Sequence, residues 1–208
     1  MSTQQHQHPE VAPLFEKTAI RRELLRQRRA LGRGEWVDRS LAIRSRLVAM
    51  DALRTAGKIH CYLSMEAERE VSTEGLPEWL CSERKMVDMP YIAHGRMAAA
   101  RYVPGLRFTK PRIGPPVPDP LVISDATGYD LVIVPLVGTD RRGGRIGFGK
   151  GWYDRFFEEM AARGGRPVKV GLAFGFQVLD RLPSDPWDQP LDMVVTETEI
   201  INCYDGKA

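Results

Sequence analysis

Apolar and polar positions alternate in two different rhythms that follow one another along this chain. Short apolar runs typical of buried strands cover residues 58–63, 85–90, 97–103, 130–137, 168–174 and 193–195. Apolar positions at helical spacing cover residues 17–31, 36–53 and 153–162, and a short helix is predicted after a cap at Ser72 or Thr73, with Pro77 in or near its first turn. Since strands alternate with helices, the pattern predicts an α/β fold with a mostly parallel sheet covered on both faces.

Length and composition favour a single domain. With 208 residues, 43% of them hydrophobic, the chain can bury one core. The longest apolar run, near residues 131–137, is much shorter than the roughly 18 residues that a membrane span needs. Residues 1–13 are polar and lack the apolar centre of a signal peptide. We therefore expect a disordered leader over residues 1–16, with its histidines His6 and His8 solvated, and a domain over residues 17–208 of a cytoplasmic protein that binds no membrane.

Cysteine usage and charge exclude further classes. Cys61, Cys81 and Cys203 are odd in number and widely spaced, which argues against a disulfide framework and against a zinc site. The net charge of +3 and the pI of about 8.8 suit a small anionic substrate and do not require nucleic acid.

The segment with the most specific chemistry runs from Arg145 to Arg155, between a predicted strand and a predicted helix. Its glycines, with Gly144, satisfy the G-x-x-x-x-G-K part of a Walker A loop, but Gly151 replaces the serine or threonine that would bind magnesium. The dinucleotide fingerprint also fails, because its third glycine comes one residue early. A glycine loop that opens a helix aims backbone N–H groups at an anion, and Lys150 adds a cation, so the segment predicts a phosphate site. A flexible surface turn is the alternative. If the site holds a metal, its ligand must come from elsewhere, and Asp154 is the nearest carboxylate.

The basic helix over residues 17–31 allows three interpretations. Its many lysines and arginines can form a solvated face, a nucleic-acid arm, or a phosphate-contacting pair made by Lys17 and Arg21, which are four residues apart. No aromatic residues interleave with the charges, which argues against nucleic acid. The phosphate interpretation requires that this helix pack near the glycine loop.

Two loops are expected at the carboxyl ends of strands, where α/β sheets bind ligands. These are residues 64–68 and the glycine loop. The segment Pro104 to Pro120 contains six prolines and is predicted to be a loop without a helix or a central strand.

Four motifs together resemble the 5-formyltetrahydrofolate cyclo-ligase family. They are Lys17-x-x-x-Arg21, Tyr62-Leu63-Ser64-Met65-x-x-Glu68, Arg145-x-Gly147-x-Gly149-x-Gly151-x-Tyr153-Asp154 and Leu191-Asp192-x-Val194-Val195-Thr196-Glu197. Their order and spacing cover nearly the whole chain after residue 16, and the third is the most specific. The resemblance implies a three-layer α/β/α sandwich. It also implies an enzyme that uses ATP and magnesium to convert 5-formyltetrahydrofolate to 5,10-methenyltetrahydrofolate, with release of ADP and phosphate.

The resemblance also implies where the ligands bind. ATP is expected at Lys17, Thr18, Ala19, Ile20 and Arg21 and at Arg145, Ile146, Gly147, Phe148, Gly149, Lys150, Gly151, Trp152 and Tyr153. Folate is expected at Leu63, Glu68 and the overlapping stretch Phe148, Gly149, Lys150, Gly151 and Trp152, and magnesium at Asp154 and Asp192. Lys150 and Arg145 are the predicted catalytic residues, since phosphoryl transfer needs charge neutralisation more than a protein nucleophile. We expect a monomer whose partner is a small folate.

Some features remain open at the level of sequence. Trp152 stands where the family usually has tyrosine, and Trp187 where many members have histidine; both changes keep a ring. Glu68 can hydrogen-bond the pterin ring or be a solvated loop carboxylate. A related protein that keeps the fold but acts on another substrate, or only binds, is one alternative function. A basic-helix RNA-binding module is the other, although no recognisable RNA-binding motif supports it.

Overall fold

A computed structural model describes residues 11–109 and 116–203, with side chains from Glu16 onward. The predicted residues His6 and His8 lie outside the described part of the chain. The main sheet has eight strands in the order β13 (Ile200–Asn202), β12 (Met193–Val195), β10 (Val168–Leu172), β7 (Leu131–Val134), β1 (Lys58–Cys61), β2 (Met86–Ala93), β3 (Arg96–Arg101) and β6 (Ile123–Ser124). The five strands from β12 to β2 are parallel, and antiparallel strands flank them on both sides. The prediction of a mostly parallel sheet is confirmed.

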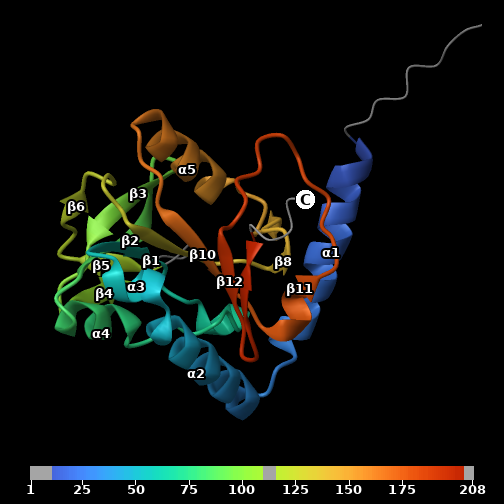
Figure 1. Cartoon of the computed structure of the whole chain (residues 1–208), viewed down its shortest axis with the longest axis horizontal. Helices are drawn as coiled ribbons and strands as arrows, with labels where there is room; N and C mark the ends of the chain where they lie inside the picture. The colour runs from blue at the N-terminus through green and yellow to red at the C-terminus, as the bar shows by residue number, and fades with distance from the viewer. Residues whose placement is uncertain (1–10, 110–115, 204–208) are drawn as a thin grey trace, which may run out of the picture.

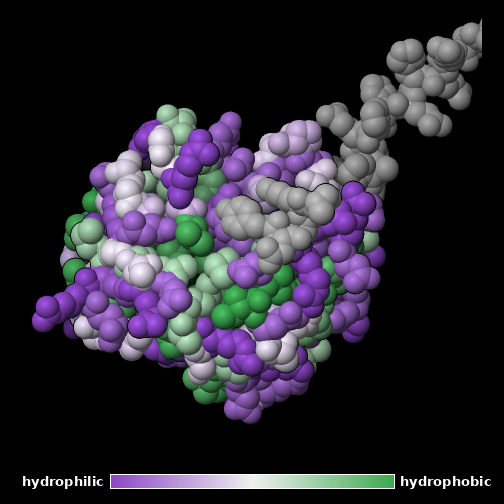
Figure 2. Space-filling view, in the orientation of Figure 1, coloured by the Kyte–Doolittle hydropathy of each residue, from purple (hydrophilic) through white to green (hydrophobic). Residues whose placement is uncertain are grey.

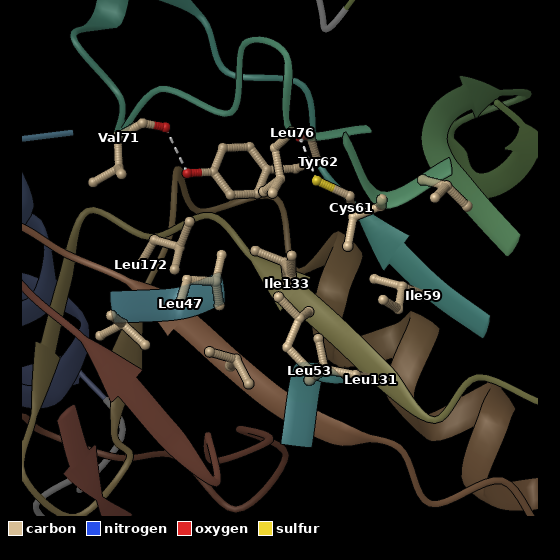
Figure 3. Packing of buried hydrophobic residues seen from close by; sticks show 14 of the residues in the cluster. Leu47, Leu53, Ile59, Cys61, Tyr62, Val71, Leu76, Leu131, Ile133 and Leu172 are labelled. Carbon is tan, nitrogen blue, oxygen red and sulfur yellow. Dashed lines mark hydrogen bonds between the residues drawn. The ribbon is translucent and has the colours of Figure 1, made fainter. Parts of the chain in front are cut away.

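Helices cover both faces of this sheet (Figure 1), which confirms the predicted three layers. On one face lie α2 (Arg33–Ala49), α3 (Asp51–Thr55) and α4 (Leu76–Ser82), and on the other lies α5 (Trp152–Ala162). Figure 3 shows the first core, in which Leu47 of α2 and Leu53 of α3 pack against Ile59 and Ile133 of the central strands. Phe156 and other buried residues of α5 form the second core with the opposite face of β7. Strand β7 is buried on both faces, which explains why it is a continuous apolar run in the sequence, whereas the equally buried β1 includes Lys58 and His60.

Helix α1 (Val11–Arg29) lies beside the main sheet, against a smaller one of order β11 (Val178–Leu179), β8 (Gly138–Asp140) and β9 (Arg145–Ile146). Leu24 of α1 packs there with Val137 and Ile146. The approach is close, because a Cβ on Gly138 would lie 2.5 Å from the Leu24 Cδ1 atom. None of the described helices has the length and apolar character that crossing a membrane requires.

Several predicted boundaries were wrong for local reasons. The predicted helix over residues 36–53 is two helices, because Met50 is extended (φ −70°, ψ 133°) between α2 and α3. The predicted cap at Ser72 or Thr73 is also wrong. Helix α4 begins after Gly75, and the Thr73 hydroxyl instead donates to the Tyr62 carbonyl; Pro77 does lie in the first turn. Helix α1 begins at Val11, within the predicted leader.

The proline-rich segment contains two short strands that its sequence does not predict. Strand β4 (Arg107–Thr109) pairs antiparallel with β5 (Val117–Asp119) in a separate two-stranded sheet, so these strands are not central ones. Residues 110–115 between them lie outside the described residues.

Candidate active site

The candidate site lies at the carboxyl ends of β1 and β7. The chain leaves β1 toward β2 on one side, and it leaves β7 toward β10 on the other, so the strand order reverses between these two neighbours. Loops that diverge from such a point leave a crevice between them, where α/β sheets bind their ligands. Residues 62–70 follow β1, and residues 135–151, which include the glycine loop, follow β7.

The glycine loop takes a backbone shape that other residues resist. Gly149 has φ +85°, and a Cβ there would lie 3.4 Å from the Arg21 guanidinium carbon. Gly151 has φ +61° and precedes α5, whose first turn has no side-chain cap. The first N–H groups of α5 therefore stay available to an anion, as the sequence predicts.

Helix α1 packs against this loop, which was the condition for the phosphate interpretation of its basic residues. The Arg21 Nε donates a hydrogen bond of 2.7 Å to the Gly147 carbonyl. Lys17, Arg21, Leu24 and Arg28 follow one another at steps of four, three and four residues, so they share one face of the helix. Lys17, Leu24 and Arg28 are buried, which contradicts a wholly solvated basic face.

Lys17 is held by two carboxylates that the sequence prediction did not include. Its Nζ lies 2.5 Å from an Asp185 oxygen and 2.6 Å from an Asp188 oxygen. Burial alone would lower the pKa of Lys17, but the hydrogen bonds to Asp185 and Asp188 outweigh it and raise that pKa. The loop between these aspartates carries Trp187, whose side chain is 61% exposed. The only sequence signal for these two partners was that Asp185 and Asp188 flank the aromatic Trp187, at least 168 positions after Lys17.

The other predicted nucleotide residues differ in exposure. Thr18 and Ala19 are exposed, Ile20 and Trp152 are half-buried, and Ile146 is buried. Lys150 is exposed, and no hydrogen bond or ion pair within the described residues holds its ammonium group. The Lys150 ammonium group is thus available to a ligand, whereas Lys17 would have to share its ammonium group between a ligand and its two aspartate partners.

Arg145 and Asp154, which were predicted to bind phosphate and magnesium, form an ion pair with each other. The Arg145 Nη2 lies 2.5 Å from the Asp154 Oδ1, and the guanidinium lies over the rings of Tyr153 and Phe157. The same Asp154 oxygen accepts the Gln189 N–H at 3.3 Å. A phosphate at Arg145 and a cation at Asp154 would each have to compete with this ion pair.

Asp192, the second predicted magnesium ligand, immediately precedes β12. Its Oδ2 accepts the Lys169 N–H at 2.7 Å. Within the described residues, no group of three or more His, Cys, Asp or Glu side chains is arranged to hold a metal ion. A magnesium at Asp154 and Asp192 would therefore take its remaining ligands from water and from substrate phosphates, which is common for this ion.

Two of the three glutamates in the loop after β1, Glu68 and Glu70, lie in very different surroundings. Glu68, the predicted folate ligand, forms an ion pair of 2.7 Å with Arg29 of α1, while Leu63 is half-buried and packs against the core. Glu70 is only 3% exposed, and its Oε2 accepts the Met65 N–H at 2.7 Å. No hydrogen bond from a described residue reaches its other oxygen. Sequence reasoning missed Glu70, although its place among three glutamates in a loop at a strand end was an available signal.

Burial changes the acidity of Glu70 and rigid contacts hold its loop. Burial raises the pKa of Glu70 to about 7, against the opposing effects of the Met65 N–H and of Arg28. The Tyr62 hydroxyl donates to the Val71 carbonyl at 2.8 Å (Figure 3), and the Ser64 N–H donates to the Thr73 hydroxyl at 3.0 Å. The loop thus presents a carboxyl group that is buried, poorly solvated and fixed in place.

Arg28 joins the two loops beneath the aromatic ring of the glycine loop. Its Nε donates to the Glu68 carbonyl at 2.7 Å, and its Nη1 donates to the Leu136 carbonyl at 3.0 Å. The guanidinium carbon lies 5.5 Å from the centre of the Phe148 ring, which is 40% exposed. In the sequence Arg28 is one of many basic residues in the first predicted helix, and its role as a buried connector was not predicted.

The face of the molecule seen in Figure 2 is mostly hydrophilic, with smaller hydrophobic groups between the charged residues. Of the aromatic side chains in residues 16–109 and 116–203, Phe148 and Trp187 are the ones that are largely exposed. Both belong to the loops described above, so flat ligand rings have two surfaces available there.

Comparison with known proteins gives one consistent result. A family model described as the 5-formyltetrahydrofolate cyclo-ligase family matches residues 14–197. The chain is 27% identical over 191 residues to 5-formyltetrahydrofolate cyclo-ligase of Mus musculus, covering 87% of this chain and 93% of that protein. It is 29% identical over 183 residues to the protein of that name from Escherichia coli K12, covering 85% and 98%. The NMR structure of Aquifex aeolicus 5,10-methenyltetrahydrofolate synthetase superposes with a TM-score of 0.79 at 29% identity, covering 92% of this chain and 95% of that one. A synthetase of the same name from Mycoplasma pneumoniae gives a TM-score of 0.69 at 25% identity, covering 88% and 99%.

Proposed function

The chain belongs to the 5-formyltetrahydrofolate cyclo-ligase family and is an enzyme, and we propose that it converts 5-formyltetrahydrofolate to 5,10-methenyltetrahydrofolate with ATP and magnesium, releasing ADP and phosphate. The observation that carries the ATP requirement is the packing of α1 against the glycine loop. That packing places Arg21 on the Gly147 carbonyl and beside Gly149, just before a helix N-terminus that has no side-chain cap. Such a surface suits a polyphosphate.

The reaction needs a phosphate because a formyl group on nitrogen is a poor electrophile. The formyl oxygen attacks the terminal phosphorus of ATP, the bond to the β-phosphate oxygen breaks, and ADP leaves. The folate N10 then attacks the activated formyl carbon to close the ring. The carbon–oxygen bond breaks, and the departing phosphate carries away the proton from N10. This sequence needs positioning and charge neutralisation more than a protein nucleophile.

The chain's cations can supply that neutralisation in three places. Lys150 is exposed and unpaired within the described residues, so it is best placed to follow the transferred phosphate. Lys17 and Arg21 line the same helix face and are proposed to bind the nucleotide. Arg145 is nearly buried and paired with Asp154, so we propose that it fixes the carboxylate as well as contacting phosphate.

Asp154 and Asp192 remain the proposed magnesium ligands. Their carboxylate oxygens are the hard donors that this ion prefers, and two protein carboxylates with substrate phosphates are a usual set. When bound, magnesium would offset charge on the phosphate oxygens. The protein's own contribution is to hold the Asp154 carboxylate in place through Arg145 and the Gln189 N–H.

For the folate we propose Glu70 together with the predicted Leu63 and Glu68. Glu70 is supported by its burial and by the carboxylate oxygen that no described residue occupies. A carboxylate of this kind suits the two adjacent N–H donors of a pterin ring, namely N3–H and the 2-amino group. Glu68 is weaker as a pterin ligand because Arg29 already occupies it. Phe148 and Trp152 are proposed to pack on the flat rings.

One assay tests the proposal. Purified full-length protein is incubated with ATP, magnesium and 5-formyltetrahydrofolate, and the methenyl product is followed by absorbance while ADP, AMP and phosphate are quantified. We expect one ADP and one phosphate for each methenyl group formed, and no AMP. Product without ATP, or AMP release, would refute this mechanism. No product in any condition would favour the related protein with another substrate.

A further inference from the structure

The guanidinium of Arg28 contains an unsatisfied donor in the interior of the candidate site. The side chain is 1% exposed, so water does not solvate it. Two of its three nitrogens donate to the carbonyls of Glu68 and Leu136, whereas the buried Nη2 has no hydrogen-bond partner in the part of the chain that the structure describes. A buried N–H without a partner is costly, and such groups in native proteins call for an explanation. A ligand that enters between the two loops is one explanation.

The surroundings of Arg28 indicate what that ligand must offer. Glu70 provides the strongest favourable charge interaction of Arg28, yet no ion pair or hydrogen bond joins the two side chains. Glu70 itself keeps one carboxylate oxygen without a partner among the described residues. Because the Arg28 Nε is bonded to the Glu68 carbonyl, two residues before Glu70, an unpaired donor and an acceptor unpaired among the described residues belong to the same loop region, close to the exposed Phe148 ring. The matching ligand is flat and carries donors beside an acceptor on one edge.

We infer that Arg28 is a specificity-determining residue of the folate site, and that its free Nη2 donates a hydrogen bond to the 4-oxo group of the pterin ring while Glu70 accepts from N3–H and the 2-amino group. This inference rests on the proposed function. The 4-oxo group is the acceptor that lies next to N3–H, so one edge of the ring satisfies both Glu70 and Arg28. The same arrangement rejects a 4-amino pterin, because that ring turns a donor toward the guanidinium and lacks the N3–H.

The position of Arg28 also explains how it stays fixed. Its other two nitrogens tie the loop after β1 to the loop after β7, and the stem rises from α1, which packs on the small sheet. A side chain anchored at two carbonyls has little freedom to turn away from a poorly matched ligand. Arg29, the next residue, lies on the exposed side and pairs with the Glu68 carboxylate, so it cannot take this role.

The test compares two ligands on the full-length protein. Dissociation constants are measured without ATP for 5-formyltetrahydrofolate and for its 4-amino-4-deoxy counterpart, in the wild type, Arg28→Gln and Arg28→Met. Arg28→Gln keeps an amide group that can still donate to the loop carbonyls. This variant should therefore fold even if Arg28→Met does not, and the test can then still be read. The matched control is Arg26→Gln, because Arg26 is exposed on the same helix and, among the described residues, its side chain pairs only with Glu23.

We expect the wild type to prefer the 4-oxo ligand, and both Arg28 variants to lose about 10- to 100-fold of that preference, the usual worth of one hydrogen bond to a charged group. The Arg26→Gln protein should keep the full preference, and the dissociation constant for ATP should not change in any variant. Equal weakening of both folates would show that Arg28 only supports the loops and would overturn the inference, as would weakened ATP binding with unchanged preference. The product assay described above reports separately on the proposed function, since a failure there leaves the two folate affinities measurable.

Discussion

The buried carboxyl group of Glu70 should make the protein less stable as pH rises from 4.5 to about 7. Burial raises the pKa of Glu70 from 4.5 to about 7, and the charged groups that face it are Arg28 of α1 and Glu68 of the same loop. The difference of about 2.5 units corresponds to about 3 kcal/mol, at about 1.4 kcal/mol for each unit. The folded protein holds the Glu70 proton more tightly than the unfolded chain does. Its stabilising effect is therefore complete below pH 4.5 and is lost progressively as pH rises to about 7.

The substitution Glu70→Gln isolates this effect. Glutamine has nearly the same shape, its amide oxygen can still accept the Met65 N–H, and it does not ionise. The variant should therefore lose the pH dependence that Glu70 causes. We expect the unfolding free energy of the variant minus that of the wild type to rise by about 3 kcal/mol between pH 4.5 and pH 8. The new amide N–H groups need acceptors, which lowers the whole difference curve by about 1–2 kcal/mol without changing its slope.

Urea unfolding of both proteins at closely spaced pH values measures the difference curve directly. Burial also lowers the pKa of His60 to about 3, so His60 removes stability as pH falls from 6.5 toward 3. That contribution is common to both proteins and cancels in the difference. Binding of 5-formyltetrahydrofolate, measured at pH 8, should weaken by at least 10-fold in Glu70→Gln, with ATP binding unchanged. A flat difference curve would refute the reasoning, because it would show that Arg28 fully compensates the ionised carboxylate.

Three further predictions follow from the nucleotide half of the site. Asp154→Asn should lower kcat by about 100-fold or more while circular dichroism shows an intact fold, and near-normal rates at limiting magnesium would contradict its role as a metal ligand. Lys17→Met should raise the KM for ATP more than the KM for folate. It should also destabilise the protein by about 1–3 kcal/mol, because Asp185 and Asp188 lose their shared cation; adding Asp185→Asn and Asp188→Asn should restore the urea midpoint but not the KM. Deletion of residues 1–10, which precede α1, should leave kcat/KM within about twofold, and a folded but inactive product would show that the leader acts at the site.

Periodicity predicted the central fold because the central strands obey simple rules. The runs 130–137 and 193–195 are apolar on both faces, and the structure places β7 and β12 within them. The short strands β8 and β9 escaped prediction, because Gly138 and Arg145 carry no apolar pattern and the two strands pair only with other short strands of the small sheet. The split of the predicted helix 36–53 depends on the backbone of Met50, a residue with no intrinsic tendency to break a helix.

The candidate site, like the fold, could be predicted from sequence only in part. The glycine loop could be found from sequence because its function requires several special residues in one short segment. The carboxylates around Lys17 could not, because they lie 168 and 171 positions further along the chain. The sequence does not show whether Glu68 or Glu70 is the buried glutamate, since burial depends on the direction of the loop after β1. The predicted metal ligands, a monomeric state and cytoplasmic location stay predictions.

Helix α1 links the two halves of the site in a way that follows from its geometry. Lys17 and Arg28 are eleven residues apart, close to three full turns, so both lie on one line of the helix about 16 Å apart. Lys17 is bound to the loop around Trp187, while Arg28 is bound to the loops after β1 and β7. A rotation of the helix would therefore displace both residues together, along with Arg21 at the glycine loop. If nucleotide and folate bind as proposed, one rigid element therefore fixes the positions of both, which meets the requirement that the formyl oxygen and the terminal phosphate be held in register.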